Sequence, residues 1–415
     1  MEEREGPQDQ RPRLRASGPI DVDDRRLSTD RFEALLNEAS SEVETEGLLH
    51  LVRSPRREAR TARLDPAVHG AIADRLRSRG IEDLWTHQAH AIARLRDGHN
   101  VIVSTGTASG KSLCFNVAVF ERILADRKTK ALYLYPTKAL AQDQLRAIRA
   151  FAIPEIAAAT YDGDTPQDER PSVRRFANIV LSNPDMLHLG ILPQHQHWAE
   201  FFGHLEFIVV DEAHMLKGVF GSHVGCILRR TLRVARHYGA EPRFILTSAT
   251  IGNPRFLAET LIGKDFIEIT EDGSPRGERL FAFWNPPFID EQNSQRGSTN
   301  WESARLVGAF VSNDVRTLAF AKSRKGAELI AKYAKQMVPV DKEEKIRPYR
   351  AGYLASERRE IEQQIFKGQL LGVAATTALE LGVDIGGLDA VVITGFPGTV
   401  AQVWQQAGRA GRSSD

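Results

Sequence analysis

The chain has 415 residues, of which 42% are hydrophobic and 26% are charged, and these proportions are typical of a globular protein with two or three domains. They exclude a mostly disordered chain and a collagen-like fibre, and the apolar runs fall far short of the roughly 20 residues that a membrane span needs. Because the formal net charge is only +1, the chain has no overall positive field toward nucleic acid, so any nucleic-acid site has to be local.

The first residues and the cysteines indicate the compartment. Residues 1–5 are mostly acidic and lack the apolar core of a secretory signal, so we expect a cytoplasmic protein, associated with the nucleoid if its source is bacterial. Two cysteines, Cys114 and Cys226, are too few for a disulfide framework or a four-cysteine zinc site. Their apolar neighbours indicate that both are small buried side chains.

The chain begins with a polar stretch. Residues 1–31 hold 15 charged side chains and three prolines, which predicts a disordered lead. The next segment, 32–65, starts with a helical pattern at Phe32, Leu35 and Leu36 and continues into an arginine-rich stretch. That stretch is either a phosphate-contacting arm or a solvated helix face, and a charge run alone favours the second.

From residue 66 onward, short apolar runs alternate with amphipathic helical segments. Such runs are typical of strands buried on both faces of a parallel sheet, and their alternation with helices predicts an α/β architecture. The expected strands are 100–105, 131–136, 178–183, 207–211 and 243–249 in a first block, and 317–321, 370–376 and 390–395 in a second. A stretch rich in glycine and proline, 271–300, separates the blocks as a linker. The sequence therefore predicts two α/β lobes, 66–270 and 301–415.

A phosphate-binding loop is indicated between an expected strand and an expected helix. Residues 105–112 read T-G-T-A-S-G-K-S, and in this context backbone amides of the turn and of the helix N-terminus bind phosphates. Lys111 is expected to reach the β- and γ-phosphates and the Ser112 hydroxyl to ligate Mg²⁺. Thr105 stands where the strict pattern has its first glycine, so this motif alone is a moderate signal.

A pair of acidic residues strengthens that signal. The expected strand 207–211 runs into Asp211-Glu212-Ala213-His214, and α/β sheets place ligand chemistry at the carboxyl ends of their strands. Asp211 is expected to hold the Mg²⁺ through water, and Glu212 to polarise the attacking water. A helix N-cap would favour one carboxylate and does not require an upstream phosphate loop, so the two motifs together predict a nucleotide and Mg²⁺ site.

The motif series resembles that of the superfamily 2 helicases. The D-E-A-H sequence is followed by T-S-A-T at 247–250 and by Q-Q-A-G-R-A-G-R at 405–412. The stretches 105–112, 218–224 and 378–389 resemble one clade, the DEAD/DEAH-like DNA helicases of the mitomycin-repair-factor type, whose full-length members end in a four-cysteine zinc module. The resemblance implies two tandem RecA-like P-loop NTPase lobes, the second lacking that module and truncated after its last helicase motif.

The resemblance also assigns residues to an ATP site. It implies that the nucleotide is bound by Gln88 at the adenine, Asp384 at the ribose, and Thr107, Ala108, Ser109, Gly110, Lys111 and Ser112 at the phosphates. Arg409 and Arg412 are expected to be arginine fingers, which neutralise charge on the γ-phosphoryl oxygens. His214, Ser248 and Thr250 are expected to couple hydrolysis to lobe movement.

The resemblance also implies a nucleic-acid track, because four segments that follow expected strands resemble the strand-contacting motifs of the family. The expected contacts are Thr137, Lys138, Gly163, Asn183 and Asp185 in the first lobe, and Ser323, Arg324, Thr376 and Thr377 in the second. Small hydroxyl residues, glycine and backbone amides bind the phosphates without reading the bases. Such a track suits a chain whose net charge is close to zero.

Two further observations concern alternative sites. His188, His195, His197 and His204 could ligate zinc, but no cysteine or carboxylate of suitable spacing accompanies them, which favours a structured loop. Only 20 residues separate Asp384 from Gln405. That is too few to add the strand-separating hairpin of the splicing-type RNA helicases.

The resemblance implies an ATP-dependent DNA helicase or translocase that moves 3′ to 5′ on single-stranded or forked DNA in DNA repair, with no membrane partner. One alternative is an RNA helicase or RNA-remodelling ATPase. Another is a nucleic-acid-binding fragment with weak catalysis, because the sequence stops at Asp415, directly after the last motif. The residues do not predict an oligomeric state.

Overall fold

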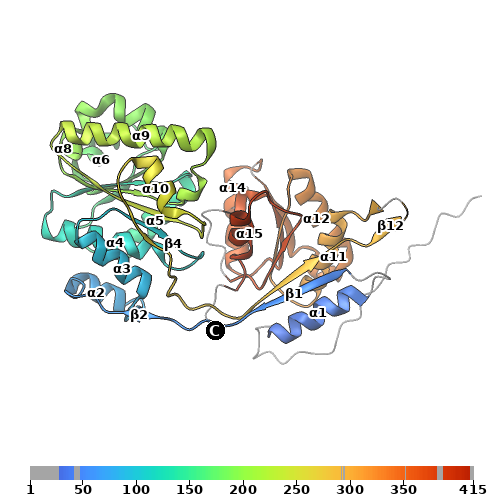
Figure 1. The fold of residues 1–415 in the computed structure, drawn as a ribbon. Helices are drawn as coiled ribbons and strands as arrows, with labels where there is room; N and C mark the ends of the chain where they lie inside the picture. Colours follow the sequence, from blue (N-terminus) through green and yellow to red (C-terminus); the bar gives the residue numbers. More distant parts are fainter. Residues whose placement is uncertain are drawn as a thin grey trace, which may run out of the picture.

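The computed structural model describes residues 28–41, 47–290, 292, 295–350, 352–380 and 387–411. Two α/β lobes lie side by side, and a long two-stranded ribbon of β1 and β11 extends from the junction of the lobes along lobe two (Figure 1). The predicted fold class is therefore confirmed. Residues 1–27, which form most of the expected disordered lead, lie outside the described residues.

Lobe one is built on a parallel sheet of seven described strands, in the order β10-β4-β9-β8-β5-β7-β6. The strands are β4 (Val101–Ser104), β5 (Lys130–Leu134), β6 (Ala158–Thr160), β7 (Ile179–Ser182), β8 (Leu205–Val210), β9 (Arg243–Ser248) and β10 (Ile267–Ile269). Successive residues of β4 enter different cores, Val101 and Val103 on one face and Ile102 on the other. Both faces are buried, which explains the continuous apolar runs.

Helices cover both faces of this sheet. One core contains residues of α2 (Gly70–Arg77), α3 (Thr86–Arg96), α4 (Lys111–Ala125) and α5 (Lys138–Arg149). The other contains residues of α6 (Arg170–Phe176), α8 (Ala199–Gly203), α9 (Gly218–His237) and α10 (Pro254–Ile262), and a short helix, α7 (Pro184–Met186), follows β7. The parallel strands all end at one edge, where the phosphate loop and the acidic pair are found.

Lobe two has a smaller parallel sheet, in the described order β15-β16-β14-β17. Its strands are β14 (Thr317–Phe320), β15 (Ile346–Tyr349), β16 (Gly372–Ala375) and β17 (Ala390–Ile393). Its helices are α11 (Thr299–Ser312), α12 (Arg324–Met337), α13 (Val340–Glu343), α14 (Ala355–Phe366) and α15 (Val400–Ala407). All eight strands that the sequence predicted are present in the two lobes.

The N-terminal helix packs on lobe two, although lobe one follows it in the chain. Helix α1 (Thr29–Ser41) begins before the expected residue 32 and places Leu35, Leu36 and Ala39 in the core of α11 and α12. The ring centroids of Phe32 and Phe310 lie 5.1 Å apart. The sequence predicted the helix but not its position.

The expected linker contains strands. Strand β11 (Arg279–Trp284) pairs antiparallel with β1 (Leu48–Ser54), and β12 (Phe288–Asp290) pairs with β13 (Gln295–Arg296). A second short pair joins β2 (Thr61–Ala62) to β3 (Leu84–Trp85). The linker is therefore one side of a paired ribbon, and its limits at 271 and 300 stay predictions.

The arginine-rich stretch is not a helix face, so that interpretation is wrong. Arg53 lies in β1, and its guanidinium forms ion pairs with Asp30 (2.9 Å), Glu33 (2.5 Å) and Glu278 (3.3 Å). Arg57 binds the Asp272 carboxylate at 2.9 Å. These two arginines connect the N-terminal segment to the linker.

The prediction that both cysteines are buried is correct for one of the two. Cys114 is buried, and burial raises the pKa of its thiol to about 12. Cys226 is exposed, so its prediction is wrong: apolar neighbours in sequence do not bury a residue on the outer face of α9.

Within the histidine cluster, His195 Nδ1 lies 2.8 Å from the Tyr238 hydroxyl. Among the described helices, none is long and apolar enough to cross a membrane.

Replacing Leu36 by alanine should destabilise lobe two, because Leu36 is 5% exposed in the core shared with α11. Truncating a buried leucine costs about 2–5 kcal/mol. Chemical unfolding followed by tryptophan fluorescence and circular dichroism would measure the change, with Leu49→Ala, at a side chain that is 62% exposed, as the control. Equal effects of the two variants would contradict the packing of α1 on lobe two.

Candidate active site

The phosphate loop, residues 105–110, joins β4 to α4 at the carboxyl edge of the lobe-one sheet. Gly110 has a φ of +62°, and a Cβ there would lie 2.6 Å from Gln88 Nε2, so the position requires glycine. Thr105 replaces the first glycine because its hydroxyl is paired inside the loop, 2.7 Å from Ser109 Oγ. Ser109 Oγ also donates to the Gly106 carbonyl at 2.8 Å. Hydrogen bonds between its own residues therefore stabilise the conformation of the loop.

Lys111 lies over this loop. Its ammonium donates to the carbonyls of Thr105 (3.2 Å) and Gly106 (2.7 Å). A phosphate bound at the start of α4 would therefore contact both the backbone amides of the helix N-terminus and the Lys111 ammonium. The expected phosphate contacts of Thr107 and Ala108 lie in the same turn, with Ala108 at a φ of +61°.

Gln88, the expected adenine contact, is buried against the phosphate loop. Its Oε1 accepts from the Trp85 amide at 3.0 Å, and its Nε2 donates to the Gly110 carbonyl at 3.1 Å. The structure therefore joins the element around residue 85 to the loop, as the sequence spacing predicted. The adenine contact itself stays a prediction.

The acidic pair follows β8. Asp211 Oδ1 accepts from the Thr247 hydroxyl and from the Glu212 amide, the latter at 2.9 Å. Burial, together with the charge of Glu212, raises the pKa of Asp211 to about 6, while Lys111 acts in the opposite direction. Burial also raises the pKa of Glu212, and Lys111 and Arg409 lower it. Both side chains are half-buried, and the loss of water favours the neutral carboxyl form of each.

These residues fit a bound Mg²⁺. Oxygen ligands are what Mg²⁺ prefers, and the carboxylate of Asp211 and the hydroxyl of Ser112, at the start of α4, supply them beside the phosphate loop. A divalent cation would favour the ionised form of both carboxylates, whose pKa values are raised mainly by loss of water.

Arg409 is the residue of lobe two that interacts electrostatically with the acidic pair. The side chain is only 6% exposed, and its Nη2 donates to the Glu380 carbonyl at 2.6 Å. Its charge lowers the pKa of Glu212, a residue of lobe one. The charge of Arg409 in lobe two thus acts on a carboxylate of lobe one across the interface. Asp384 and Arg412, the other expected contacts from lobe two, lie outside the described residues.

A second connection crosses between the lobes at His214. Its Nδ1 accepts from the Ala249 amide at 3.3 Å, and its Nε2 lies 2.6 Å from the side-chain amide of Gln405. Burial lowers the pKa of His214 to about 4, so the ring is neutral. Sequence reasoning missed Gln405, although it opens the motif that contains Arg409.

The other coupling residues differ in their surroundings. Ser248 is buried, and its hydroxyl donates to the Ala249 carbonyl at 2.7 Å. Thr250 is exposed. Thr107, expected only at the phosphates, also reaches lobe two, because its hydroxyl donates to the Gly408 carbonyl at 3.3 Å.

Three residues of the expected nucleic-acid track cap helices. Thr137, Asn183 and Ser323 follow β5, β7 and β14, and each side chain accepts from a backbone amide in the first turn of the next helix, at 3.3, 2.8 and 3.0 Å. All three therefore stand at carboxyl edges of the two sheets. Helix N-termini at such edges attract phosphates.

The rest of the expected track is more varied. Lys138 forms an ion pair with Asp164 at 2.7 Å, and a Cβ at Gly163 would lie 3.3 Å from its ammonium, so these two segments meet. Asp185, Arg324 and Thr377 are exposed, and Thr376 is half-buried. Their contacts with nucleic acid stay predictions.

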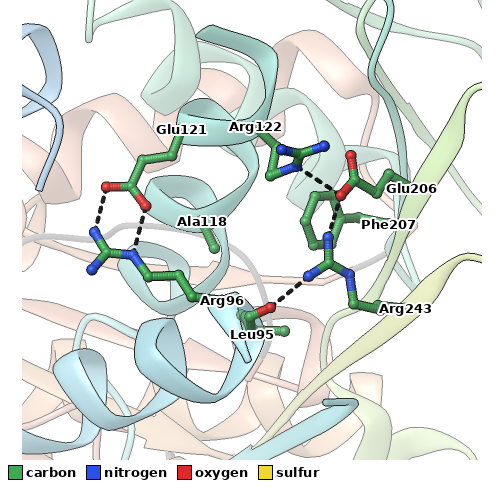
Figure 2. Close-up of a pocket in the computed structure, with 8 residues that line it drawn as sticks. All are labelled: Leu95, Arg96, Ala118, Glu121, Arg122, Glu206, Phe207 and Arg243. Carbon is green, nitrogen blue, oxygen red and sulfur yellow. Dashed lines mark hydrogen bonds and ion pairs between the residues drawn. The ribbon is translucent and has the colours of Figure 1, made fainter. Parts of the chain in front are cut away.

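A separate cavity of about 230 Å³ lies at the opposite edge of the lobe-one sheet, near the start of β8 and β9 (Figure 2). Its charged side chains pair with one another: Arg96 with Glu121 at 2.7 Å, and Arg122 with Glu206 at 2.8 Å. Arg243 contacts Glu206 and the Leu95 carbonyl as well (Figure 2). This cavity is not part of the phosphate-loop site.

Both lobes match known families. Residues 85–257 match the DEAD/DEAH box helicase family, and residues 303–414 match the helicase conserved C-terminal domain. The chain is 46% identical over 360 residues to the uncharacterized ATP-dependent helicase YprA of Bacillus subtilis, covering 86% of this chain and 48% of YprA. It is 41% identical over 398 residues to the ATP-dependent helicase hrq1 of Schizosaccharomyces pombe, covering 92% of this chain and 37% of hrq1. The chain thus spans about half the length of these relatives, or less.

Solved structures are similar in the arrangement of the lobes as well. The DUF1998 helicase MrfA bound to DNA and AMPPNP superposes with a TM-score of 0.85 at 44% identity, over 91% of this chain and 54% of that one. A crystal structure described only as that of MrfA superposes with a TM-score of 0.68 at 41% identity, over 84% of this chain and 50% of that one. The MrfA structure bound to DNA alone superposes as well as the one with AMPPNP, with the same TM-score of 0.85.

Binding of a divalent cation with nucleotide should weaken as the pH falls below about 6, the pKa of Asp211. Because that pKa is raised, the carboxylate is protonated below this value and a cation has to displace the proton, which costs up to about tenfold in affinity per pH unit. Electron paramagnetic resonance of Mn²⁺ would measure the affinity between pH 5 and 8. Asp211→Asn is the control for titration of the nucleotide itself, and an identical pH dependence in both proteins would contradict the assignment.

Proposed function

This chain belongs to the superfamily 2 helicases, and from that premise we propose that it is an ATP-dependent helicase or translocase of DNA. In our proposal ATP hydrolysis drives 3′ to 5′ movement on single-stranded or forked DNA during DNA repair, in the cytoplasm or at the nucleoid. The observation that carries the proposal is the composite site: the phosphate loop and the acidic segment of lobe one contact the motif that contains Arg409 in lobe two, through Thr107 with Gly408 at 3.3 Å and His214 with Gln405 at 2.6 Å.

The phosphates would be bound by the backbone amides of the loop and by Lys111. Asp211 and Ser112 would hold Mg²⁺, which supplies charge neutralisation at the phosphate oxygens when bound. Glu212 would orient and polarise the attacking water, and Arg409 would neutralise charge developing on the γ-phosphoryl group. Arginine fingers contribute about 10³–10⁵ in rate in related NTPases.

Movement follows from the division of this site between the lobes. Arg409 can act only when lobe two stands against Glu212, and the neutral hydrogen bond between His214 and Gln405 stabilises the same arrangement. Loss of the γ-phosphate removes the charge that Arg409 compensates, so the lobes separate. Because the expected track has residues on both lobes, each cycle would shift one set of phosphate contacts relative to the other.

DNA is favoured over RNA as the track. The superposed MrfA structure at 44% identity is described as bound to DNA, whereas a neighbour described as bound to RNA, Mss116p, is 16% identical and shares the fold alone. Contacts with phosphates do not themselves distinguish the two polymers.

The Glu212→Gln variant should bind ATP but hydrolyse it about 10²–10⁴-fold more slowly, because the amide cannot accept a proton from the attacking water. Steady-state phosphate release would measure the rate, and a fluorescent ATP analogue the binding. Glu241→Gln, at a surface carboxylate paired with Arg236, is the matched control. Retained turnover would remove Glu212 from its assigned role.

Single-stranded DNA should stimulate ATP hydrolysis by the 415-residue chain several-fold more than single-stranded RNA of the same sequence. The reason is that strand binding across both lobes stabilises the arrangement in which Arg409 faces Glu212. Phosphate release measured with each polymer tests this. Preference for RNA would favour an RNA-remodelling ATPase, and binding of DNA without hydrolysis a binding protein.

A further inference from the structure

His87 lies at a junction that the proposed mechanism does not use. The side chain is fully buried and contacts two segments that are far apart in the sequence. Its Nε2 lies 2.8 Å from the Ser109 carbonyl in the phosphate loop, and its Nδ1 accepts from the Gly273 amide at 3.2 Å. Because Nδ1 accepts, Nε2 carries the proton and donates to Ser109. Burial lowers the pKa of His87, which maintains this neutral form.

The junction is tightly packed on its other side. Gly273 accepts from the Arg60 amide at 2.9 Å, and Arg60 in turn accepts from the Thr86 amide at 2.8 Å. A Cβ at Gly273 would lie 2.2 Å from Thr86 Oγ1, so only glycine fits between these segments. Asp272 lies beside the loop too, since a Cβ at Gly106 would be 3.1 Å from its carboxylate.

From this junction the paired ribbon runs directly to lobe two. Arg57 and Arg276 exchange backbone hydrogen bonds of 2.8 and 2.9 Å, and the pairing of β1 with β11 continues from there to Trp284 (Figure 1). Trp284 Nε1 then donates to Glu302 of α11 at 3.0 Å. A continuous series of hydrogen-bonded segments therefore extends from the phosphate loop to lobe two, and His87 makes its first contact.

We infer that His87 is a positioning residue that links the conformation of the phosphate loop to the ribbon of β1 and β11, so that bound nucleotide alters the ribbon. The inference rests on the proposed ATP-dependent function. When phosphate binds the loop, the Ser109 carbonyl shifts, the imidazole follows, and the Gly273 amide moves with it. The ribbon thereby gives lobe two a second connection to the nucleotide, distinct from the contacts at Arg409 and His214.

Two substitutions separate the two hydrogen bonds of His87. In His87→Gln the amide nitrogen takes the place of Nε2 and keeps the bond to Ser109, while the acceptor for Gly273 is lost. In His87→Asn the amide oxygen takes the place of Nδ1 and keeps the acceptor, while the donor to Ser109 is lost. His90, exposed on the same helix, provides the matched controls His90→Gln and His90→Asn.

The measurement is hydrogen exchange of the ribbon amides in the full chain, with and without Mg²⁺–AMPPNP, beside the affinity for AMPPNP. In the wild type, AMPPNP should change exchange in 48–54 and 279–284. His87→Gln should bind AMPPNP within about threefold of the wild type but lose this change, whereas His87→Asn should bind about tenfold more weakly through loss of one buried hydrogen bond.

A wild-type ribbon that does not respond to AMPPNP would overturn the inference without any variant, and so would His87 variants that behave like the His90 controls. Neither readout needs hydrolysis. A responsive ribbon without ATP turnover would therefore overturn the proposed function alone, turnover with an unresponsive ribbon would overturn this inference alone, and failure to bind AMPPNP would overturn both.

Discussion

Two half-buried carboxylates side by side are the constraint on which the rest of the site depends. Asp211 and Glu212 both have raised pKa values because the protein shields them from water, and the charge of Glu212 raises the pKa of Asp211 further. Lobe one offsets this with Lys111 and with hydrogen bonds to Asp211. Arg409 of lobe two adds to this compensation, and a bound cation would add further positive charge. The electrostatics of one short segment therefore favour contact between the lobes.

The contact at His214 has a different character. Its ring is neutral, so its bonds to Ala249 and to Gln405 depend on geometry rather than on net charge. Neutral hydrogen bonds weaken steeply with misalignment. The interface thus combines a charge interaction, which acts over several ångströms, with a directional bond that forms only when the lobes are in register.

Much of the fold could be predicted because its strands are buried on both faces. All residues of β4 and β7 are buried, and such strands give continuous apolar runs. β15 was missed because it contains Arg347 and Pro348 and buries only its two end residues. The phosphate loop and the acidic pair could be found because their chemistry fixes residue types at fixed spacing.

His87 carried no such signal, whereas Gln405 opens the motif at 405–412, which does not reveal that its partner is His214. A histidine in a polar helical turn has the pattern of a surface residue, and its burial results from Gly273, which lies 186 positions further along the chain. The packing of α1 on lobe two is hidden for the same reason: an amphipathic helix indicates that it has a partner but not which partner. Contacts between distant segments are what the sequence pattern leaves undetermined.

The position of α1 has a consequence for synthesis on the ribosome. Arg305 of lobe two donates to the Ala39 carbonyl across 266 positions, and at about 5–20 residues per second such a separation takes roughly fifteen to fifty seconds to translate. Lobe one, whose segments are contiguous, emerges in that interval. The apolar face of α1 therefore remains without its partner during that time, and α1 is synthesised long before it can make its native contacts with lobe two.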